Sequence, residues 1–392
     1  MTTTINNEHK KLNVPNLRFP EFQGEWEKYE LGDICDIITD FVAAGSFASL
    51  RENVKYYQEN NYAQLIRTID LKNNFTNSDF VYVDEVAYDF LWRVQLKEPN
   101  IVLPNIGANI GEKYYVKPQD LPKNKNVLGP NAILLRSKCN DTHFVYFRLS
   151  TSSYDNEMKK LVGASGQPKF NKTDLKKVSL FMPSLIEQKR IAYFLALLEE
   201  RIATQNKIID KMQSLIKGIA QKIVRSNKPN VRLYECVECS SSTQQESEVC
   251  EQGAYPVYGA NGIVGYLDDY NTEGEAVYII KDGSGVGTVS YVTGKCSATG
   301  TLNTLQAKDG YSLQYLYYLL KVFNFEPYKT GMAIPHIYFK DYGKAKVFCP
   351  SYTEQLQYAR LLSAIDSKLS VEKNTLRNLS LQKQYLLRQM FI

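Results

Sequence analysis

The chain has 392 residues, of which 44% are hydrophobic and 12% aromatic, and it carries a formal net charge of +5. This length and composition are typical of a folded protein with about two domains, and they exclude an intrinsically disordered chain. Because no apolar run approaches the ~20 residues of a membrane span and residues 1–10 are polar, we expect a cytoplasmic protein with no membrane partner.

The chain is expected to alternate two β-rich globular regions with two long helices, which is an α+β organisation. Runs rich in Tyr and β-branched residues, separated by Gly, Asn and Asp, recur through residues 60–136 and again through 254–306. Shorter helical stretches are predicted around 143–161 and 312–324. The domains that these patterns predict are 17–182, 183–227, 228–349 and 350–392.

Both long helices begin with the same short motif. The segment Pro183–Gln188 aligns with Pro350–Gln355 at an offset of 167 residues, and each begins with Pro-Ser and ends with Glu-Gln. Ser184 and Ser351 are expected to cap the first helical turn, and the Glu three residues later would complete a capping box. The motif therefore marks the starts of two related helices.

The offset of 167 continues along both helices, where apolar residues recur at intervals of three, four or seven. This spacing places them on one helical face and indicates a coiled-coil seam. A helix of about 40 residues spans ~60 Å, far more than the core of one small domain requires. Since the nearest matching apolar stripe belongs to the other helix, we expect an antiparallel pair that separates the globular regions. The predicted seam residues are Leu195, Leu198, Ile202, Ile209, Met212, Leu362, Ile365, Leu369, Leu376 and Leu379.

A strand that enters a glycine-bearing turn occurs once in each globular region. Residues 101–111 (IVLPNIGANIG) resemble residues 277–287 (VYIIKDGSGVG) at an offset of 176. Neither segment has the GK[ST] continuation of a nucleotide-binding loop or an acidic partner on a βαβ pattern, which favours tight turns between strands. The change of offset from 176 to 167 indicates insertions or deletions, so the globular regions have diverged more than the helices.

The excess positive charge lies on the two helices. Residues 185–225 carry a net charge of +4 and residues 352–392 carry +3, whereas residues 1–184 carry +1 and residues 226–351 carry −3. Any contact between the globular regions and nucleic acid must therefore come from local clusters of charge.

Two lysine-rich segments lie at matching places just before the helices, at residues 159–177 and 329–346. They mix lysine with small, amide and aromatic side chains, which suits DNA groove edges and phosphates, although a solvated loop and strand would have the same composition. The residues that we expect to contact DNA, on these segments and on the glycine turns, are Asn105, Asn109, Ser165, Gln167, Lys169, Asn171, Lys172, Ser284, Thr288, His336, Tyr338 and Lys340.

The sequence predicts neither a catalytic site nor a metal site. The three His residues have no recognisable acid or nucleophile partner, and Walker A and amino-methyltransferase motifs are absent. The seven Cys residues are odd in number and scattered, which indicates reduced thiols. Cys236 and Cys239 form one CxxC with Cys250 nearby, but no second CxxC or His pair completes a zinc site.

The duplicated helix start, at the end of two unlike globular regions, resembles the specificity subunits of type I restriction-modification systems. The resemblance extends from Leu17–Trp26 to the second long helix. It implies that regions 17–182 and 228–349 are target recognition domains, each reading one half of a split DNA sequence. The helices would set the gap between the halves, about two turns of DNA at ~34 Å per turn.

The resemblance also implies the partners of this chain in host defence. Two methyltransferase subunits would carry S-adenosylmethionine, and motor-nuclease subunits would hydrolyse ATP with Mg, so this chain itself is expected to be non-catalytic and without a cofactor. The residues that read bases are not implied by the resemblance. Because the second globular region is negatively charged, we expect the partner subunits to supply part of the DNA affinity.

Two other functions remain open on the sequence. The paired helices would also suit a non-catalytic assembly protein that tethers two protein-binding domains and has no DNA role. An enzyme acting at the glycine turns is the third hypothesis, and it requires nucleotide binding by the chain alone. Unchanged DNA specificity and affinity after substitution of Lys169, Lys172 and Lys340 would favour the assembly protein.

Overall fold

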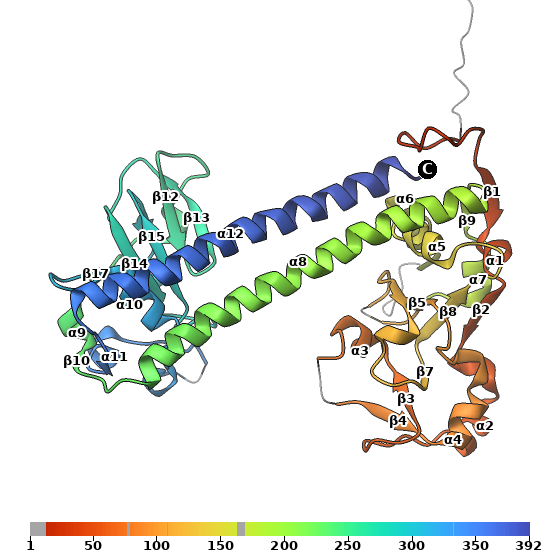
Figure 1. Cartoon of the computed structure of the whole chain (residues 1–392), viewed down its shortest axis with the longest axis horizontal. Helices are drawn as coiled ribbons and strands as arrows, with labels where there is room; N and C mark the ends of the chain where they lie inside the picture. Colours follow the sequence, from red (N-terminus) through yellow and green to blue (C-terminus); the bar gives the residue numbers. More distant parts are fainter. Residues whose placement is uncertain (1–12, 77–78, 108, 163–168, 332) are drawn as a thin grey trace, which may run out of the picture. The chain divides into compact units, whose positions relative to one another are not determined.

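The computed structural model describes residues 13–76, 79–107, 109–162, 169–331 and 333–392 (Figure 1). The chain forms two compact units. Unit 1 comprises the chain up to Ile202 together with Asn378–Ile392, and unit 2 comprises Ala203–Arg377. The long helices α8 (Leu185–Arg225) and α12 (Tyr352–Gln389) therefore each contribute residues to both units. Within the described ranges, no helix is both long enough and apolar enough to cross a membrane.

The described residues of unit 1 form three β-sheets. A four-stranded antiparallel sheet has the strand order β2-β8-β5-β6. In a three-stranded sheet, β3 pairs antiparallel with β4 and parallel with β7, while β1 pairs with β9 in a two-stranded sheet. The strands are β1 (Glu27–Glu30), β2 (Ile37–Asp40), β3 (Ala63–Ile66), β4 (Val81–Val83), β5 (Asn100–Pro104), β6 (Tyr114–Val116), β7 (Asn126–Leu128), β8 (Ala132–Arg136) and β9 (Ser179–Met182).

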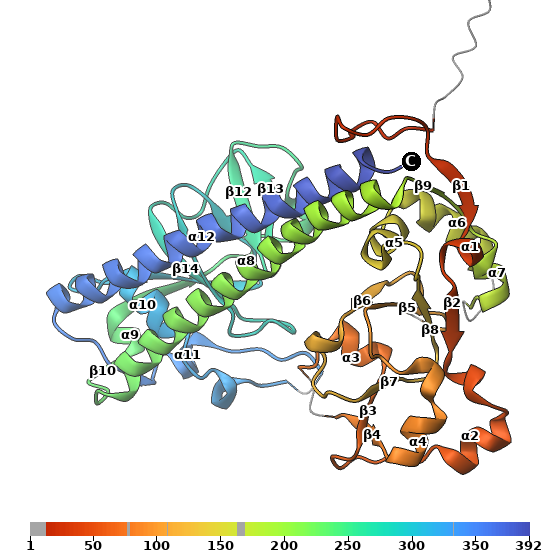
Figure 2. The ribbon, with the colours of Figure 1, turned by 45° about the vertical axis from the view of Figure 1, so that its right-hand side comes forward.

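Short helices connect these strands, and α5 lies against β5 and β6 (Figure 2). The stretch that was expected to be helical around 143–161 is divided into α5 and α6. The helices and 3-10 helices of unit 1 before α8 are α1 (Leu31–Ile34), η1 (Phe41–Ala44), α2 (Phe47–Asn53), α3 (Thr68–Lys72), α4 (Glu85–Phe90), η2 (Trp92–Val94), η3 (Pro118–Asp120), α5 (Thr142–Leu149), α6 (Ser152–Val162) and α7 (Lys172–Lys176).

Unit 2 has the same sheet topology, with strand orders β11-β17-β14-β15, β13-β12-β16 and β10-β18. The parallel pair also recurs, because β12 pairs parallel with β16 as β3 does with β7. Its elements are β10 (Val231–Arg232), α9 (Leu233–Cys236), β11 (Val237–Ser241), η4 (Glu246–Glu248), β12 (Tyr255–Gly259), β13 (Gly262–Leu267), β14 (Glu275–Ile280), β15 (Val289–Thr293), β16 (Ser297–Ala298), β17 (Leu302–Ala307), α10 (Leu313–Leu320), η5 (Glu326–Tyr328), α11 (Phe339–Tyr342) and β18 (Lys346–Val347).

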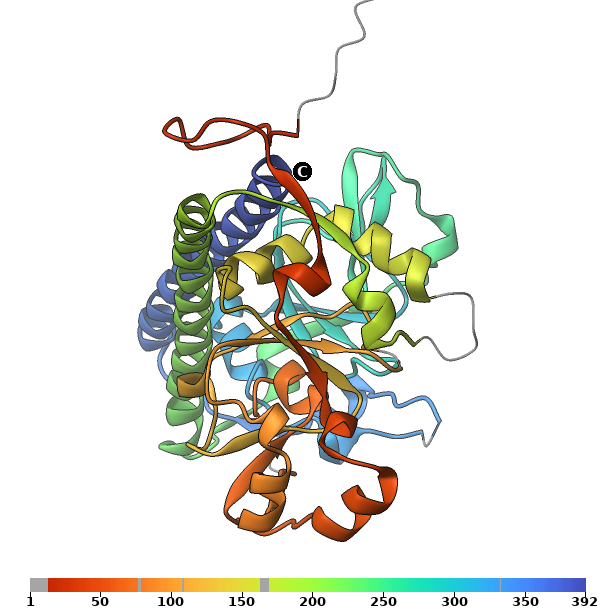
Figure 3. The same cartoon turned by 90° about the vertical axis from the view of Figure 1, so that its right-hand side faces the viewer.

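The two units differ mainly in the connections between strands. Unit 1 inserts η1 and α2 between β2 and β3, and α4 and η2 between β4 and β5, whereas the corresponding connections of unit 2 contain only η4 among the described residues. Figures 1 and 3 show α2 and α4 at the end of unit 1 opposite to β1. The duplication therefore covers the sheets, and the inserts distinguish one copy from the other.

The central strands are continuous apolar runs because both of their faces are buried. In β5, Ile101 and Leu103 face the core that contains α5, while Val102 faces the core beneath the three-stranded sheet. In unit 2, β14 follows the same alternation, with Val277 and Ile279 in one core and neighbouring residues in the other. This arrangement leaves the turns at the strand ends, and not the sheet faces, available to a ligand.

The long helices contact each other in each unit, and they run antiparallel. In unit 1, the beginning of α8 packs with the end of α12, and in unit 2 the end of α8 packs with the beginning of α12. Gln205 donates a hydrogen bond of 3.1 Å to the backbone carbonyl of Glu372, the position equivalent to it at an offset of 167. Of the predicted seam residues, those buried are Leu195, Leu198, Ile209, Leu362, Leu369 and Leu379, and those partly buried against the cores are Ile202, Met212, Ile365 and Leu376.

A buried glutamine at the start of each long helix holds that helix to the globular part of its unit. The amide nitrogen of Gln188 donates to the carbonyl of Pro183 at 2.9 Å, and its amide oxygen accepts from the backbone N–H of Asp141 at 3.0 Å. Gln355 makes the same two bonds, to Pro350 at 2.9 Å and from Ser312 at 2.9 Å. Because Asp141 and Ser312 cap α5 and α10, each glutamine fixes one helix start against another.

Replacing Gln188 by alanine is expected to lower the free energy of unfolding by about 2–3 kcal/mol, because it leaves a buried backbone donor and acceptor without partners. Thermal and urea unfolding of the full chain measure this loss. Gln382→Ala, at an exposed position of α12, is the matched control and should change the stability little. Equal stability of the two variants would contradict the role assigned to Gln188.

The capping box that was predicted at both helix starts is complete only at the second. Ser351 and Glu354 exchange hydrogen bonds, with the Glu354 N–H donating to Oγ at 3.4 Å and the Ser351 N–H donating to the carboxylate at 3.2 Å. At the first helix the carboxylate of Glu187 instead accepts from Arg18, at 2.7 and 2.8 Å, and from Trp26 Nε1 at 3.3 Å. Arg18 and Trp26, in the N-terminal segment, therefore bind the carboxylate that would otherwise complete the capping box.

Candidate nucleic-acid interface

The glycine turn of unit 1 is fixed by the segment that precedes α7. The backbone carbonyl of Asn105 accepts from the N–H of Phe170 at 3.2 Å, and its side-chain amide donates to the carbonyl of Phe170 at 3.3 Å. Ile106 and Lys169 form a β-bridge beside this contact. Gly107 takes a φ of 90°, which other residues adopt at a cost. Asn105 and Lys169, distant in sequence, are thereby brought together.

The other predicted residues of unit 1 have distinct surroundings. Asn171 caps α7 by accepting from the N–H of Asp174 at 2.8 Å, and Lys172 forms an ion pair with Asp40 at 2.8 Å. Asn109 accepts from Lys72 at 2.9 Å. Their side chains therefore also stabilise the turn and the helix start. The predicted residues Ser165 and Gln167 lie outside the described residues.

The glycine turn of unit 2 is fixed by the same kind of backbone contacts, but different residues occupy the equivalent positions. Gly283 has a φ of 93° and its N–H donates to the carbonyl of Pro335 at 2.9 Å, while the N–H of Ile337 donates to the carbonyl of Lys281 at 2.9 Å. A β-bridge joins Asp282 to His336. Lys281 thus corresponds to Asn105 at the offset of 176, and His336 corresponds to Lys169 at the offset of 167. The repeat with an offset of 176 and the repeat with an offset of 167 therefore contact each other at the glycine turn in both units.

Three predicted residues of unit 2 form an aromatic and cationic cluster at this turn. The rings of His336 and Tyr338 lie 4.9 Å apart in an edge-to-face arrangement, and Lys340 Nζ lies 5.0 Å from the centre of the Tyr338 ring. Tyr338 is 48% exposed, so its ring is accessible to a ligand. Ser284 and Thr288 are exposed on the glycine turn. Aromatic faces with adjacent cations suit contacts to bases and phosphates.

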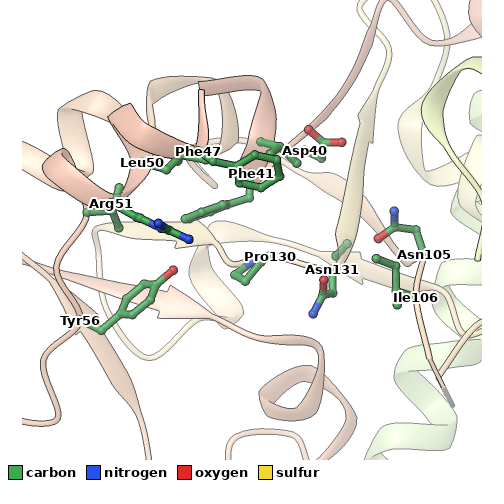
Figure 4. A pocket seen from close by; sticks show the side chains of 13 residues that line it. Asp40, Phe41, Phe47, Leu50, Arg51, Tyr56, Asn105, Ile106, Pro130 and Asn131 are labelled. Atoms are coloured by element: carbon green, nitrogen blue, oxygen red, sulfur yellow. The ribbon is translucent and has the colours of Figure 1, made fainter. Parts of the chain in front are cut away.

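A hollow of about 390 Å³ in unit 1 contains polar residues that the sequence did not indicate (Figure 4). Arg51 and Tyr56 lie on one side, and Asn131 and Asn105 on the other, with Pro130 between them. Burial raises the pKa of the Tyr56 hydroxyl, which therefore stays protonated and can donate a hydrogen bond. The apolar residues that line it are Phe41, Val42, Phe47, Leu50, Val54, Ile106 and Ala132. Asn131 has a φ of 65°, and the Gly-Pro that precedes it is the kind of dipeptide that would have indicated a turn here, although it was not used above.

Of the two cysteines of the CxxC, Cys236 is buried in the core of unit 2 and Cys239 is partly buried against the same core. Cys236 Sγ lies 3.8 Å from Cys349 Sγ in the core, and Cys250 is exposed. In the part of the chain that the structure describes, no group of three or more His, Cys, Asp and Glu side chains could hold a metal ion.

The fold and these surfaces define a duplicated binding protein. The same glycine turn occurs in both units, with different polar residues at the equivalent positions. The model of a family described as the type I restriction modification DNA specificity domain matches residues 23–214 and 230–380. The chain therefore belongs to the type I restriction-modification DNA specificity family, and each unit carries a DNA-recognition domain. The family and the duplicated α+β organisation predicted from the sequence are confirmed.

Individual relatives are similar at low identity. The putative type I restriction enzyme MjaX specificity subunit of Methanocaldococcus jannaschii is 25% identical over 292 residues, which are 72% of this chain and 64% of the relative. The type I restriction enzyme EcoprrI specificity subunit of Escherichia coli is 27% identical over 117 residues, or 30% and 29% of the two chains. The matches thus span less than two thirds of both relatives.

Solved structures share the fold. The S subunit of a type I restriction-modification system from M. genitalium has a TM-score of 0.67 with this chain at 18% identity, over 97% of this chain and 99% of that one. A chain from a study of complex assembly and conformational transition of the type I R-M system has a TM-score of 0.51 at 14% identity, over 93% and 97%.

Proposed function

We propose that this chain recognises a bipartite site in double-stranded DNA, with unit 1 and unit 2 each reading one half. The observation that carries the proposal is the duplicated glycine turn, which is fixed in both units by the segment preceding a short helix. It brings Asn105 and Lys169 together in one unit and Lys281 and His336 together in the other. One backbone with different side chains suits two readers of different base sequences.

In this proposal the long helices space the two readers and dock the catalytic subunits. The 41 residues of α8 correspond to about 60 Å of helix. Beyond the seam, both helices carry exposed apolar side chains that suit a partner helix, among them Ile186, Tyr193 and Tyr385. The partners are two methyltransferase subunits, which bind S-adenosylmethionine, and motor-nuclease subunits, which bind ATP and Mg. This chain supplies specificity and no catalytic group.

The experiment is reconstitution of the chain with a methyltransferase of the same system, followed by mapping of the methylated positions in DNA. We expect a single two-part sequence with a fixed gap. Methylation without regard to sequence would contradict the proposal. If substitution of Lys169 and Lys340 left both the DNA affinity and the methylation pattern unchanged, the chain would instead be an assembly protein.

A further inference from the structure

A second hollow in unit 1, of about 500 Å³, lies where β2, η2, β8 and α7 come together. We call it the basic hollow, because four cations and one carboxylate line it. Trp92 forms part of its wall and is 64% exposed, which is unusual for a tryptophan outside a binding surface. The charged lining residues are Arg93, Arg136, Lys172, Lys176 and Asp36.

Two of the four cations are available to a ligand. Arg136 forms an ion pair with Glu98 at 2.9 Å, and Lys172 is engaged by Asp40. Arg93 and Lys176 are exposed, and among the described residues no carboxylate lies within ion-pair distance of either. The guanidinium of Arg93 lies 4.9 Å from the centre of the Trp92 ring, which orients it beside the hollow.

The basic hollow continues into the candidate DNA-contacting surface. A neighbouring depression, lined by Asn105, Lys169 and Asn171, shares Lys172 and Thr173 with it. A duplex that contacts the glycine turn would therefore place its backbone near the cations of the hollow. Lys172 connects the two surfaces.

The cations that line the basic hollow on β8 and α7 are not repeated at the equivalent described positions of unit 2. The positions equivalent to the cations of β8 and α7 hold Ala307, Phe339 and Gly343, by strand register and by the offset of 167. The connection between β13 and β14 contains no 3-10 helix equivalent to η2 among its described residues. Residues 226–351 also carry a net charge of −3.

We propose that the basic hollow binds a backbone phosphate of DNA, with Trp92 against the adjoining sugar, and that unit 2 has no equivalent phosphate site. This inference rests on the proposed function. Neutralising a DNA phosphate releases counterions, so each such contact makes affinity more dependent on salt. The basic hollow then gives unit 1 one salt-dependent contact that unit 2 lacks.

The first test measures the affinity of the reconstituted complex for its cognate duplex between about 50 and 200 mM salt. Arg93→Gln combined with Lys176→Gln removes this one phosphate contact, so it should reduce the slope of log affinity against log salt by about 1, equally for cognate and unrelated duplexes. Lys228→Gln, an exposed cation of unit 2, should leave the slope unchanged. An unchanged slope in the double variant, with specific binding intact, would overturn this inference but would not contradict the proposed function. Absence of specific binding by the wild-type complex would instead contradict the proposed function.

The second test uses tryptophan fluorescence of the full chain. Of its two Trp residues, Trp26 is 2% exposed and Trp92 is 64% exposed, so Trp92 reports on the hollow. Duplex DNA should quench the emission of the wild-type chain, and Trp92→Phe should abolish the response. Equal quenching by inorganic phosphate alone would indicate a small-anion site, and a response to the methyltransferase without DNA would indicate a protein contact. Either result would overturn the inference.

Discussion

Replacement of Arg18 by alanine is expected to lower the free energy of unfolding by about 3–5 kcal/mol, because it leaves the carboxylate of Glu187 buried and unpaired. The side chain of Glu187 is 2% exposed, and Arg18 holds it through two hydrogen bonds. Hydrogen bonding to Glu187 raises the pKa of Arg18, so the guanidinium stays charged. Urea unfolding of the full chain, followed by circular dichroism, measures the effect.

The chain offers a matched control for this substitution. Arg190 lies 3.8 Å from Glu21, and both side chains are at least half exposed, so Arg190→Ala should cost about 1 kcal/mol or less. Replacing Arg18 and Glu187 together by leucine should recover most of the stability lost in the single variant. A loss for Arg18→Ala no larger than that for Arg190→Ala would show that the buried pair does not hold the N-terminal segment in place.

The double substitution Tyr338→Ala, Lys340→Ala is expected to weaken DNA binding by the reconstituted complex at one half-site only. Loss of a base contact costs about 1–3 kcal/mol, or roughly 5- to 150-fold in affinity. The measurement compares duplexes in which one half-site or the other is scrambled. Scrambling the half read by unit 2 should no longer weaken binding by the variant, whereas scrambling the other half should still do so.

Tyr270 and Lys295 provide a control of the same chemistry in unit 2. Lys295 Nζ lies 4.5 Å from the centre of the Tyr270 ring, and Lys295 lies near the start of β14, whereas the glycine turn follows the end of that strand. Its double alanine variant should retain the affinity and the sensitivity of the wild-type chain to scrambling of either half. If both double variants behaved alike, the cluster at Tyr338 would have no special part in reading DNA.

The long helices were predictable because their signal is local and periodic. The spacing of Leu195 and Leu198 reports one helical face directly, and the Pro-Ser start marks its beginning. Strand order has no such local signal. Val102 and Val277 belong to apolar runs that are buried on both faces, and such runs carry no information on the partner strand. Only the structure shows that the two units share one topology.

The candidate surfaces were predictable only in part, for a related reason. Lys169 and His336 lie in segments whose composition suits DNA, and the fold brings each beside a glycine turn. Arg51, Tyr56 and Trp92 belong to inserts of unit 1, and tertiary structure alone places them next to the predicted residues. The role of Gln188 also escaped sequence reasoning, because it binds Asp141 and Pro183 through their backbone groups, which any residue at those positions would offer.

The glutamine at the start of each long helix has a consequence for the evolution of the protein. Gln188 and Gln355 bind only backbone groups on the globular side, apart from a side-chain bond between Gln188 and Asn140. Substitutions in the turns and inserts therefore leave this attachment intact. A gene segment that encodes one globular part could be replaced by recombination while the helices keep their pairing, so new specificities could arise without a new scaffold.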